Sequence, residues 1–192
     1  MINQAKLIVD ISKYIYKRKL VSGKAGNISS RFKSEEGDII AITPTFKSLK
    51  NLKEEDIVLL DLEGNVLTKG KPSSEFNLHL SIYKKREDIN GIVHSHSPYA
   101  TGFAFSDIKI ESRERLETNS MGYVPEVQYD KPGSEKLAIN VSEAVVNEDV
   151  ILLKDHGVVC LGNSLEEASE LAEFLEDTAK TQFISYILNI KR

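Results

Sequence analysis

The sequence predicts an α/β protein in which helices cover the faces of a mixed β-sheet. Two observations carry this prediction. Short apolar runs interleave irregularly with segments of helical periodicity, and no repeat or linker divides the 192 residues. Regular alternation of strands and helices would favour a parallel sheet, whereas irregular interleaving favours a mixed one. A chain of this length can bury most of its apolar surface, so we expect a single domain over residues 1–192.

The first half of the chain opens with an amphipathic helix over residues 4–20, where apolar side chains recur at helical spacing. Strands are expected at 38–43 and 57–67. The second of these is folded into a hairpin by the Glu-Gly-Asn turn at 63–65. A short helix over 74–85 follows Pro72, which suits a helix start.

The second half contains three further strands and three further helices. Ser164, followed three residues later by Glu167, is a capping-box pattern at the start of the last helix. In chain order we expect a strand at 91–95, a helix at 98–105, a helix from near 133–134 to 145, strands at 150–154 and 157–161, and a helix at 165–187.

Composition excludes several broad classes of protein. The formal net charge is −4 and the pI is about 5.7, which argues against general nucleic-acid or anionic-membrane binding. No apolar run approaches the roughly 18 residues that span a bilayer, and the amino terminus has no signal-peptide core. The single cysteine, Cys160, rules out an internal disulfide and is expected to be a buried strand residue. We therefore expect a cytoplasmic protein.

Three of the four histidines lie at the ends of predicted strands. His94 and His96 close the strand at 91–95, and His156 follows the strand at 150–154. Side chains two residues apart on a strand share a face, with Cα atoms about 6–7 Å apart, so two imidazoles can bind one metal ion. A third imidazole from a neighbouring strand leaves one coordination position open, as catalytic sites require. The pattern predicts a catalytic metal site.

Three polar segments can bind an anion, although each also has an ordinary structural explanation. Residues 23–29 form a glycine-rich turn that can expose N–H groups, but they lack the P-loop pattern. The hydroxyls in 42–45 suit either a phosphate or a capped turn. Residues 71–75 start a helix, where the dipole favours an anion and where Ser74 can equally serve as a plain N-cap.

Three more side chains have open roles. Glu75 can be a metal ligand, a general base or an ordinary first-turn acid. Tyr129 lies in a loop and is either a packing or surface residue or a phenol that delivers a proton. His79 shares a helix face with apolar residues, so we expect it to pack or to support the site rather than to bind a metal.

Taken together, these segments resemble the class II aldolase/adducin family, and within it the branch of L-fuculose-phosphate aldolases. The resemblance extends from about residue 1 to 188, and the segments occur in the family's order. They are residues 23–29 (GKAGNIS), 42–45 (ITPT), 71–75 (KPSSE), 93–96 (VHSH), Tyr129 with Gly133, and 155–157 (DHG).

The resemblance implies a fold and a set of site residues. The fold is a three-layer αβα arrangement with a central mixed, largely antiparallel sheet flanked by helices. One Zn²⁺ per subunit would be held by His94, His96 and His156, with Glu75 as a fourth ligand or displaced base. Tyr129 would protonate the aldehyde oxygen during cleavage. The substrate phosphate would be bound by Asn27, Thr45, Ser73 and Ser74.

The resemblance also implies a reaction and an assembly. The substrate would be a ketose 1-phosphate, L-fuculose 1-phosphate or similar. Cleavage through a metal-stabilised enediolate would give dihydroxyacetone phosphate and a short aldehyde such as L-lactaldehyde; glycolaldehyde and glyceraldehyde are chemically acceptable too. The expected assembly is a homotetramer with active sites at subunit interfaces, which would explain why Tyr129 need not lie near Glu75 within one subunit.

Other members of the family set the alternatives. Sugar-phosphate epimerases usually carry Asp where this chain has Glu75, and the dehydratases normally carry Ala in place of Ser74. Adducins are non-catalytic interaction proteins that have lost much of the metal set. This chain departs from the aldolases at Phe46, where glycine is common. If a backbone N–H there holds phosphate with φ above zero, Phe46 would be strained.

Overall fold

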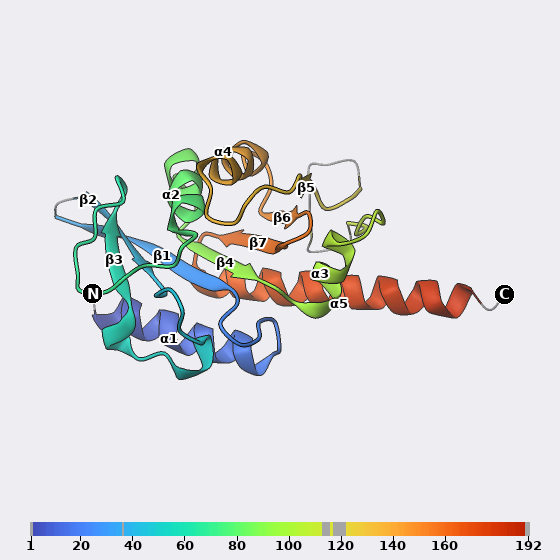
Figure 1. Ribbon diagram of the computed structural model, residues 1–192, viewed down its shortest axis with the longest axis horizontal. Coiled ribbons are helices and arrows are strands. Elements are labelled where there is room, and N and C mark those ends of the chain that lie inside the picture. The colour runs from blue at the N-terminus through green and yellow to red at the C-terminus, as the bar shows by residue number, and fades with distance from the viewer. Residues whose placement is uncertain (1, 36, 113–115, 117–121, 191–192) are drawn as a thin grey trace.

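The computed structural model describes residues 2–35, 37–112, 116 and 122–190 and contains a seven-stranded sheet with the strand order β3-β2-β1-β4-β7-β6-β5 (Figure 1). Neighbouring strands are antiparallel except for the parallel pair β5–β6. The sheet is therefore mixed and largely antiparallel, as predicted. The strands are β1 (Asn27–Ser34), β2 (Gly37–Ile42), β3 (Val58–Asp61), β4 (Gly91–Ser95), β5 (Glu126–Val127), β6 (Val150–Leu153) and β7 (Gly157–Gly162).

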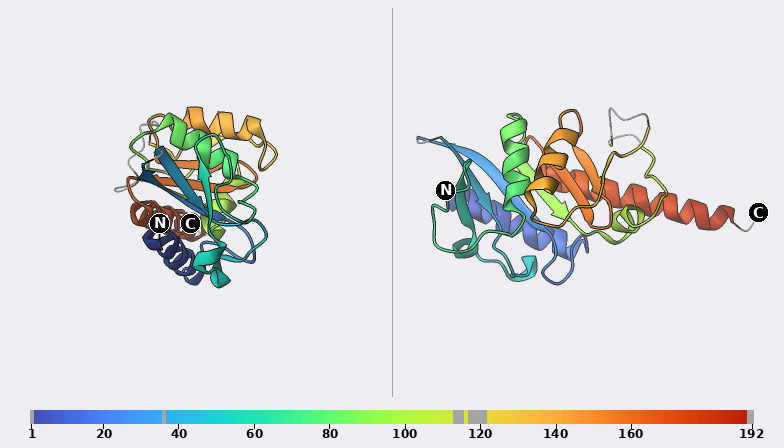
Figure 2. Two further views of the ribbon diagram at one scale, coloured as in Figure 1. Left: turned by 90° about the vertical axis from the view of Figure 1, so that its left-hand side faces the viewer. Right: turned by 45° about the horizontal axis from the view of Figure 1, so that its top comes forward.

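Helices cover both faces of the sheet, which gives the predicted three layers. Figures 1 and 2 show α1 and α5 on one face and α2 and α4 on the other, with the far half of α5 extending past the sheet. The helices are α1 (Ile2–Lys17), α2 (Phe76–Lys85), α3 (Pro98–Ala104), α4 (Glu135–Ala144) and α5 (Leu165–Asn189), and two 3₁₀ turns occupy Leu49–Asn51 and Glu54–Asp56.

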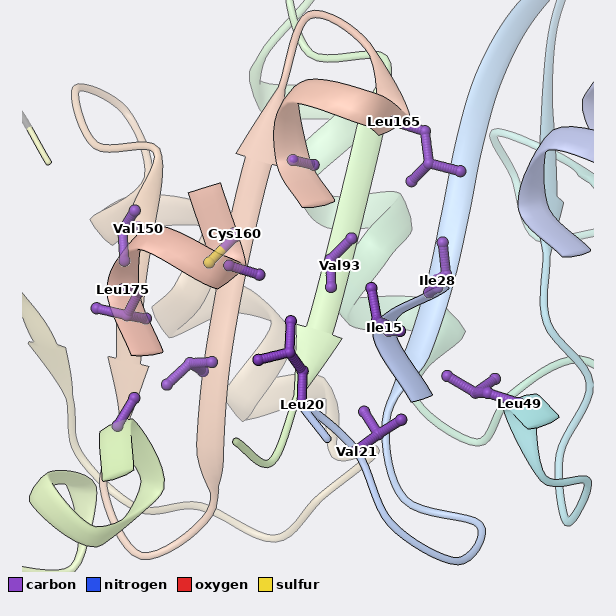
Figure 3. Packing of buried hydrophobic residues seen from close by; sticks show 14 of the residues in the cluster. Ile15, Leu20, Val21, Ile28, Leu49, Val93, Val150, Cys160, Leu165 and Leu175 are labelled. Carbon is purple, nitrogen blue, oxygen red and sulfur yellow. The ribbon is translucent and has the colours of Figure 1, made fainter. Parts of the chain in front are cut away.

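Each face of the sheet has its own apolar core. On the α1 and α5 face, Val93 of β4 and Cys160 of β7 pack with Leu175 of α5 (Figure 3). On the other face, Ile92 of β4 and Leu161 of β7 pack beneath α2 and α4. Adjacent residues of one strand thus enter different cores, because side chains alternate across a sheet. Both central strands are wholly buried, and Cys160 is a buried strand residue as predicted.

Two strands escaped prediction, and a third is shorter than predicted. β1 carries polar side chains on one face, so its sequence lacks the apolar run of a buried strand, and β5 has only two residues. The hairpin expected over 57–67 reduces to β3 and one isolated bridge, Leu60 to Val66. At α5, the Ser164 hydroxyl accepts from the Glu167 N–H as predicted. The Glu167 carboxylate, however, accepts from the N–H of Asn163, one residue before the N-cap.

The antiparallel pairing brings three parts of the chain to one edge of the sheet. Asn27, the first residue of β1, pairs with His94 of β4, and Ser95 pairs with Val158 of β7. Within the described residues, no helix is both long enough and apolar enough to cross a membrane.

Candidate active site and metal centre

Three imidazole rings meet where the central strands end. The ring centroids of His94, His96 and His156 are 4.9, 4.8 and 5.0 Å apart in pairs. The Nε2 atoms of His94 and His96 are 3.1 Å apart, and one ligand atom from each ring lies within 4.8 Å of the others. Nitrogens bonded tetrahedrally to one ion at about 2.0–2.1 Å would be roughly 3.3–3.4 Å apart. The three rings therefore form a cluster that a single ion can bridge.

The turn between β6 and β7 brings His156 against the end of β4. Gly157, the next residue, lies at the closest approach of the two segments. A Cβ atom at this position would lie 2.6 Å from the carbonyl oxygen of Ser95 and 3.2 Å from the His96 ring. Only glycine fits this contact without displacing the backbone or the ring.

A main-chain carbonyl orients the His94 ring. The Nδ1 atom of His94 lies 2.9 Å from the oxygen of Val158. Because a carbonyl oxygen only accepts hydrogen bonds, Nδ1 carries a proton. In the neutral ring the lone pair then belongs to Nε2, the atom that faces His96 and Glu75. Hydrogen bonds of this kind fix the tautomer of a metal-binding imidazole.

The Glu75 carboxylate closes the cluster from the start of α2. Its Oε2 lies 3.2 Å from Nε2 of His94, and its Oε1 lies 3.6 Å from Nε2 of His156. Glu75 is buried. Within the described part of the chain, neither its Oε1 nor the Nδ1 of His156 has a hydrogen-bond partner. Buried polar atoms without partners are costly, so an ion or substrate group at this position would stabilise the site.

The protonation states of His96 and His156 suit a cation ligand set, whereas the Glu75 carboxylate favours a proton on His94. Burial, helped by the nearby His94, lowers the pKa of His96 to about 3 and that of His156 to about 4. Both rings are therefore neutral at pH 7, the form that binds metal ions. Burial also lowers the pKa of His94, but the Glu75 carboxylate outweighs it, so this pKa is raised. Burial raises the pKa of Glu75, whereas His94 and His156 lower it and prevail.

A cavity of about 190 Å³ opens beside this cluster. Two main-chain hydrogen bonds assemble its wall: the Thr45 N–H donates to the Lys71 oxygen at 3.1 Å, and the Ser73 N–H donates to the Thr43 oxygen at 3.0 Å. The structure thus brings the predicted phosphate-binding segments together with the predicted metal site. Its lining includes Asn27, Thr45, Ser73, Ser74, Glu75, His96 and His156.

Two features of this wall were not expected from the sequence. Lys24 lines the cavity and adds a positive charge to its wall, whereas the sequence indicated only N–H groups in the glycine-rich turn. The alternative in which Ser74 caps α2 is wrong. Glu75 occupies the N-cap position, and its N–H donates to the Ser73 hydroxyl oxygen at 3.3 Å, while Ser74 is exposed in the cavity wall.

Comparison with known proteins identifies the family. Residues 6–183 match the model of the class II aldolase and adducin N-terminal domain. The chain belongs to the class II aldolase/adducin family.

Relatives in this family include two kinds of carbon–carbon lyase. The chain is 44% identical over 186 residues to an L-fuculose phosphate aldolase of Methanocaldococcus jannaschii, which covers 95% of this chain and 97% of that protein. It is 37% identical over 186 residues to a 3-oxo-tetronate 4-phosphate decarboxylase of Haemophilus influenzae, which covers 94% and 87%. These relatives and the family match establish the predicted enzyme class, a lyase of the class II aldolase type.

A solved structure confirms the fold of this family member. An L-fuculose 1-phosphate aldolase superposes with a TM-score of 0.88 at 29% sequence identity, covering 97% of this chain and 87% of that one. The predicted αβα layering therefore agrees both with the strand order and with a solved structural neighbour.

Tyr129 is the predicted site residue that belongs neither to the histidine cluster nor to the cavity lining. Its side chain is 55% exposed. The loop that carries it nevertheless touches the cavity wall, because a Cβ atom on Gly133 would lie 2.7 Å from the Ser74 oxygen. Gly133 also has a φ of 78°, a conformation that favours glycine. Within one subunit, Tyr129 is thus an exposed residue of a loop that touches the cavity wall, and it does not line the cavity.

Phe46 departs from the family pattern in the way the sequence suggested. It lines the cavity with a φ of 59°, and its side chain is 77% exposed. A left-handed conformation is unfavourable for a residue with a side chain, and an exposed phenyl ring gains little from packing. Such strain commonly marks a backbone that is held for ligand binding.

Replacing Phe46 should separate the effect of the backbone strain on stability from the effect of the phenyl ring. We expect Phe46→Gly to be more stable than Phe46→Ala by about 1 kcal/mol, because both remove the ring and only glycine relieves the left-handed conformation. Urea unfolding of the two variants without ligand measures this difference. Equal stability, or a more stable alanine variant, would show that position 46 carries no such strain.

Proposed function

We propose that this protein is a zinc-dependent aldolase that reversibly cleaves a ketose 1-phosphate. L-fuculose 1-phosphate or a close analogue would give dihydroxyacetone phosphate and a short aldehyde such as L-lactaldehyde. The observation that carries the proposal is the junction of two sites: three imidazoles and Glu75 adjoin the same small cavity as the hydroxyls of Thr45, Ser73 and Ser74.

His94, His96 and His156 would hold the ion, and the donor set fits zinc because all three ligands are imidazole nitrogens. When bound, Zn²⁺ supplies Lewis-acid polarisation of the substrate's carbonyl oxygen. The protein contributes the geometry. The Val158 carbonyl holds His94 in the required tautomer, and Gly157 allows the two strand ends to approach.

Glu75 would move the proton on the nucleophilic carbon. Its Oε2 is already bonded to the amide of Asn27 at 2.9 Å, whereas Oε1 has no partner in the described part of the chain. Oε1 is therefore the atom available to accept a proton from substrate. General-base catalysis needs such an atom within hydrogen-bond reach of the carbon acid.

The remaining cavity wall would bind the phosphate. Thr45, Ser73 and Ser74 offer hydroxyls, and Asn27 offers an amide. Lys24 adds a positive charge at the same wall. Binding energy from a non-reacting phosphate fixes the orientation of the reacting carbons, which is how remote contacts raise the rate.

A decarboxylase acting on a 3-oxo sugar-acid phosphate is the second candidate. The relative of that name, 37% identical over nearly the whole chain, favours it. In both reactions, the carbon α to a carbonyl loses a carbon substituent, and negative charge develops on that α carbon. They differ in whether an aldehyde or carbon dioxide leaves.

The proposal predicts chelator-sensitive turnover. Purified protein should convert L-fuculose 1-phosphate to dihydroxyacetone phosphate, lose this activity with a chelator and regain it with Zn²⁺. A coupled reduction of the product measures the rate, and 3-oxo-tetronate 4-phosphate is assayed in parallel. Release of carbon dioxide with no aldol cleavage would favour the decarboxylase, and full activity in the metal-free protein would overturn the metal mechanism.

We further propose that residues 1–192 form one domain of a cytoplasmic homotetramer whose active sites lie between subunits. Two cores sharing one sheet support the single domain. The outer half of α5 supports the assembly, because it carries exposed apolar side chains, and patches of such side chains commonly mark interfaces. These exposed side chains are Phe183, Ile184, Ile187 and Leu188.

Shared sites can be tested by subunit mixing. Glu75→Gln and Tyr129→Phe should each be nearly inactive alone, yet mixed and reassociated subunits should recover activity. If each site takes Glu75 from one subunit and Tyr129 from its neighbour, random mixing leaves about one site in four intact. Each variant reassociated with itself is the control. No recovery in mixed tetramers verified by light scattering would place both residues in one subunit's site.

A further inference from the structure

The polar face of β1 and one face of α2 form a ladder of buried side chains that ends at Glu75. Asn27, Ser29 and Arg31 alternate along β1 and so point to the same side of the sheet. They meet side chains spaced four residues apart on α2. Two strand residues advance about 6.6 Å and four helix residues about 6 Å, so successive contacts stay in step. The three partners are Glu75, His79 and Tyr83.

Each rung is a hydrogen bond between buried atoms. The Asn27 amide nitrogen lies 2.9 Å from Glu75 Oε2, and the Asn27 oxygen lies 2.5 Å from His79 Nε2. The Ser29 hydroxyl lies 2.6 Å from His79 Nδ1 and 2.8 Å from the Tyr83 hydroxyl. All five side chains are buried, so these groups depend on one another rather than on water.

The chemistry of the end group sets the direction of every bond. A carboxylate only accepts, so the NH₂ of Asn27 faces Glu75 and its oxygen faces His79. That oxygen also only accepts, so Nε2 of His79 donates. Nδ1 of neutral His79 must then accept from the Ser29 hydroxyl, and Ser29 in turn accepts from Tyr83. Every donor therefore points toward Glu75.

Arg31 anchors the other end of this ladder. Its guanidinium lies 5.2 Å from the centre of the Tyr83 ring and donates to the Tyr83 carbonyl oxygen at 3.0 Å and the Arg86 oxygen at 2.9 Å. A cation at the last carbonyls of a helix complements its dipole. α2 is thus tied to β1 at both ends, with Glu75 at the amino end.

We propose that His79 is a positioning residue for the reaction proposed above, held as the Nε2–H tautomer in a one-way chain from Tyr83 through Ser29 and Asn27 to Glu75. The chain occupies Oε2 of Glu75 and leaves Oε1 free to face the ion and the substrate. Hydrogen bonds aligned in one direction polarise each other, which strengthens the hydrogen bond from Asn27 to the Glu75 carboxylate. The inference rests on the proposed function only for its kinetic consequence.

The tautomer is the first test and needs no turnover. Nitrogen-15 spectra of the full chain, labelled at histidine, should show His79 with a protonated Nε2 and an unprotonated Nδ1 at pH 7. His79→Gln assigns the signals. A protonated Nδ1, alone or with Nε2, reverses the Ser29 bond and overturns the chain.

The kinetic test compares replacements at His79. His79→Leu should lower kcat about tenfold with KM and metal content nearly unchanged, because the two hydrogen bonds of His79 to Asn27 and Ser29 are lost and the substrate and metal contacts remain. His79→Gln, which can both donate and accept, should recover most of the loss. Tyr83→Phe should have a smaller effect because it removes only the far donor.

Ser81→Ala is the matched control, since Ser81 lies on α2 but bonds to the oxygens of Leu78 and Ala138 outside the ladder. A folded, metal-replete His79→Leu variant with wild-type kcat would overturn the positioning role. If His79→Leu does not fold, the kinetics of His79→Gln and Tyr83→Phe, together with the tautomer of His79, test the positioning role instead. Absence of turnover in the wild-type chain would instead count against the proposed function, and the tautomer would still decide whether the chain exists.

Discussion

The approach of one buried carboxylate to three imidazoles is the interaction on which this site depends. Glu75 comes from the start of α2, while the rings come from β4 and from the turn before β7. Burial removes the water that solvates a charged group, so it disfavours the charged form unless a nearby charge compensates. Here the Glu75 carboxylate favours a proton on His94, while the other two rings stay neutral. A cation bound by the three neutral rings would take the place of that proton beside the carboxylate.

The surrounding fold keeps that donor set in place. Antiparallel pairing puts Asn27 beside His94 and Ser95 beside Val158, so both neighbours of β4 contribute to the site. The same pairing places the cavity wall next to the rings, because Thr43 follows β2 directly and receives the Ser73 N–H. The proposed metal site and the proposed phosphate-binding wall then lie at the same end of the central strands, as the proposed aldolase reaction requires.

Much of this could be predicted from sequence, for identifiable reasons. The central strands could be predicted because both of their faces are apolar. His94 and His96 could be predicted to bind one ion because side chains two residues apart on a strand share a face. β1 could not be found in that way. Its polar face is buried against polar partners on α2, and no local pattern distinguishes Ser29 or Arg31 in such a strand from the same residues in a loop. Tyr129 is a different case, since its proposed role depends on a neighbouring subunit.

Zinc K-edge X-ray absorption of the unmodified, zinc-loaded protein tests the central claim most directly. We predict one ion per chain with three imidazole nitrogens and an oxygen at about 2.0–2.2 Å. Fewer than three imidazoles around the ion, a sulfur ligand, or no ion retained after dialysis would contradict it.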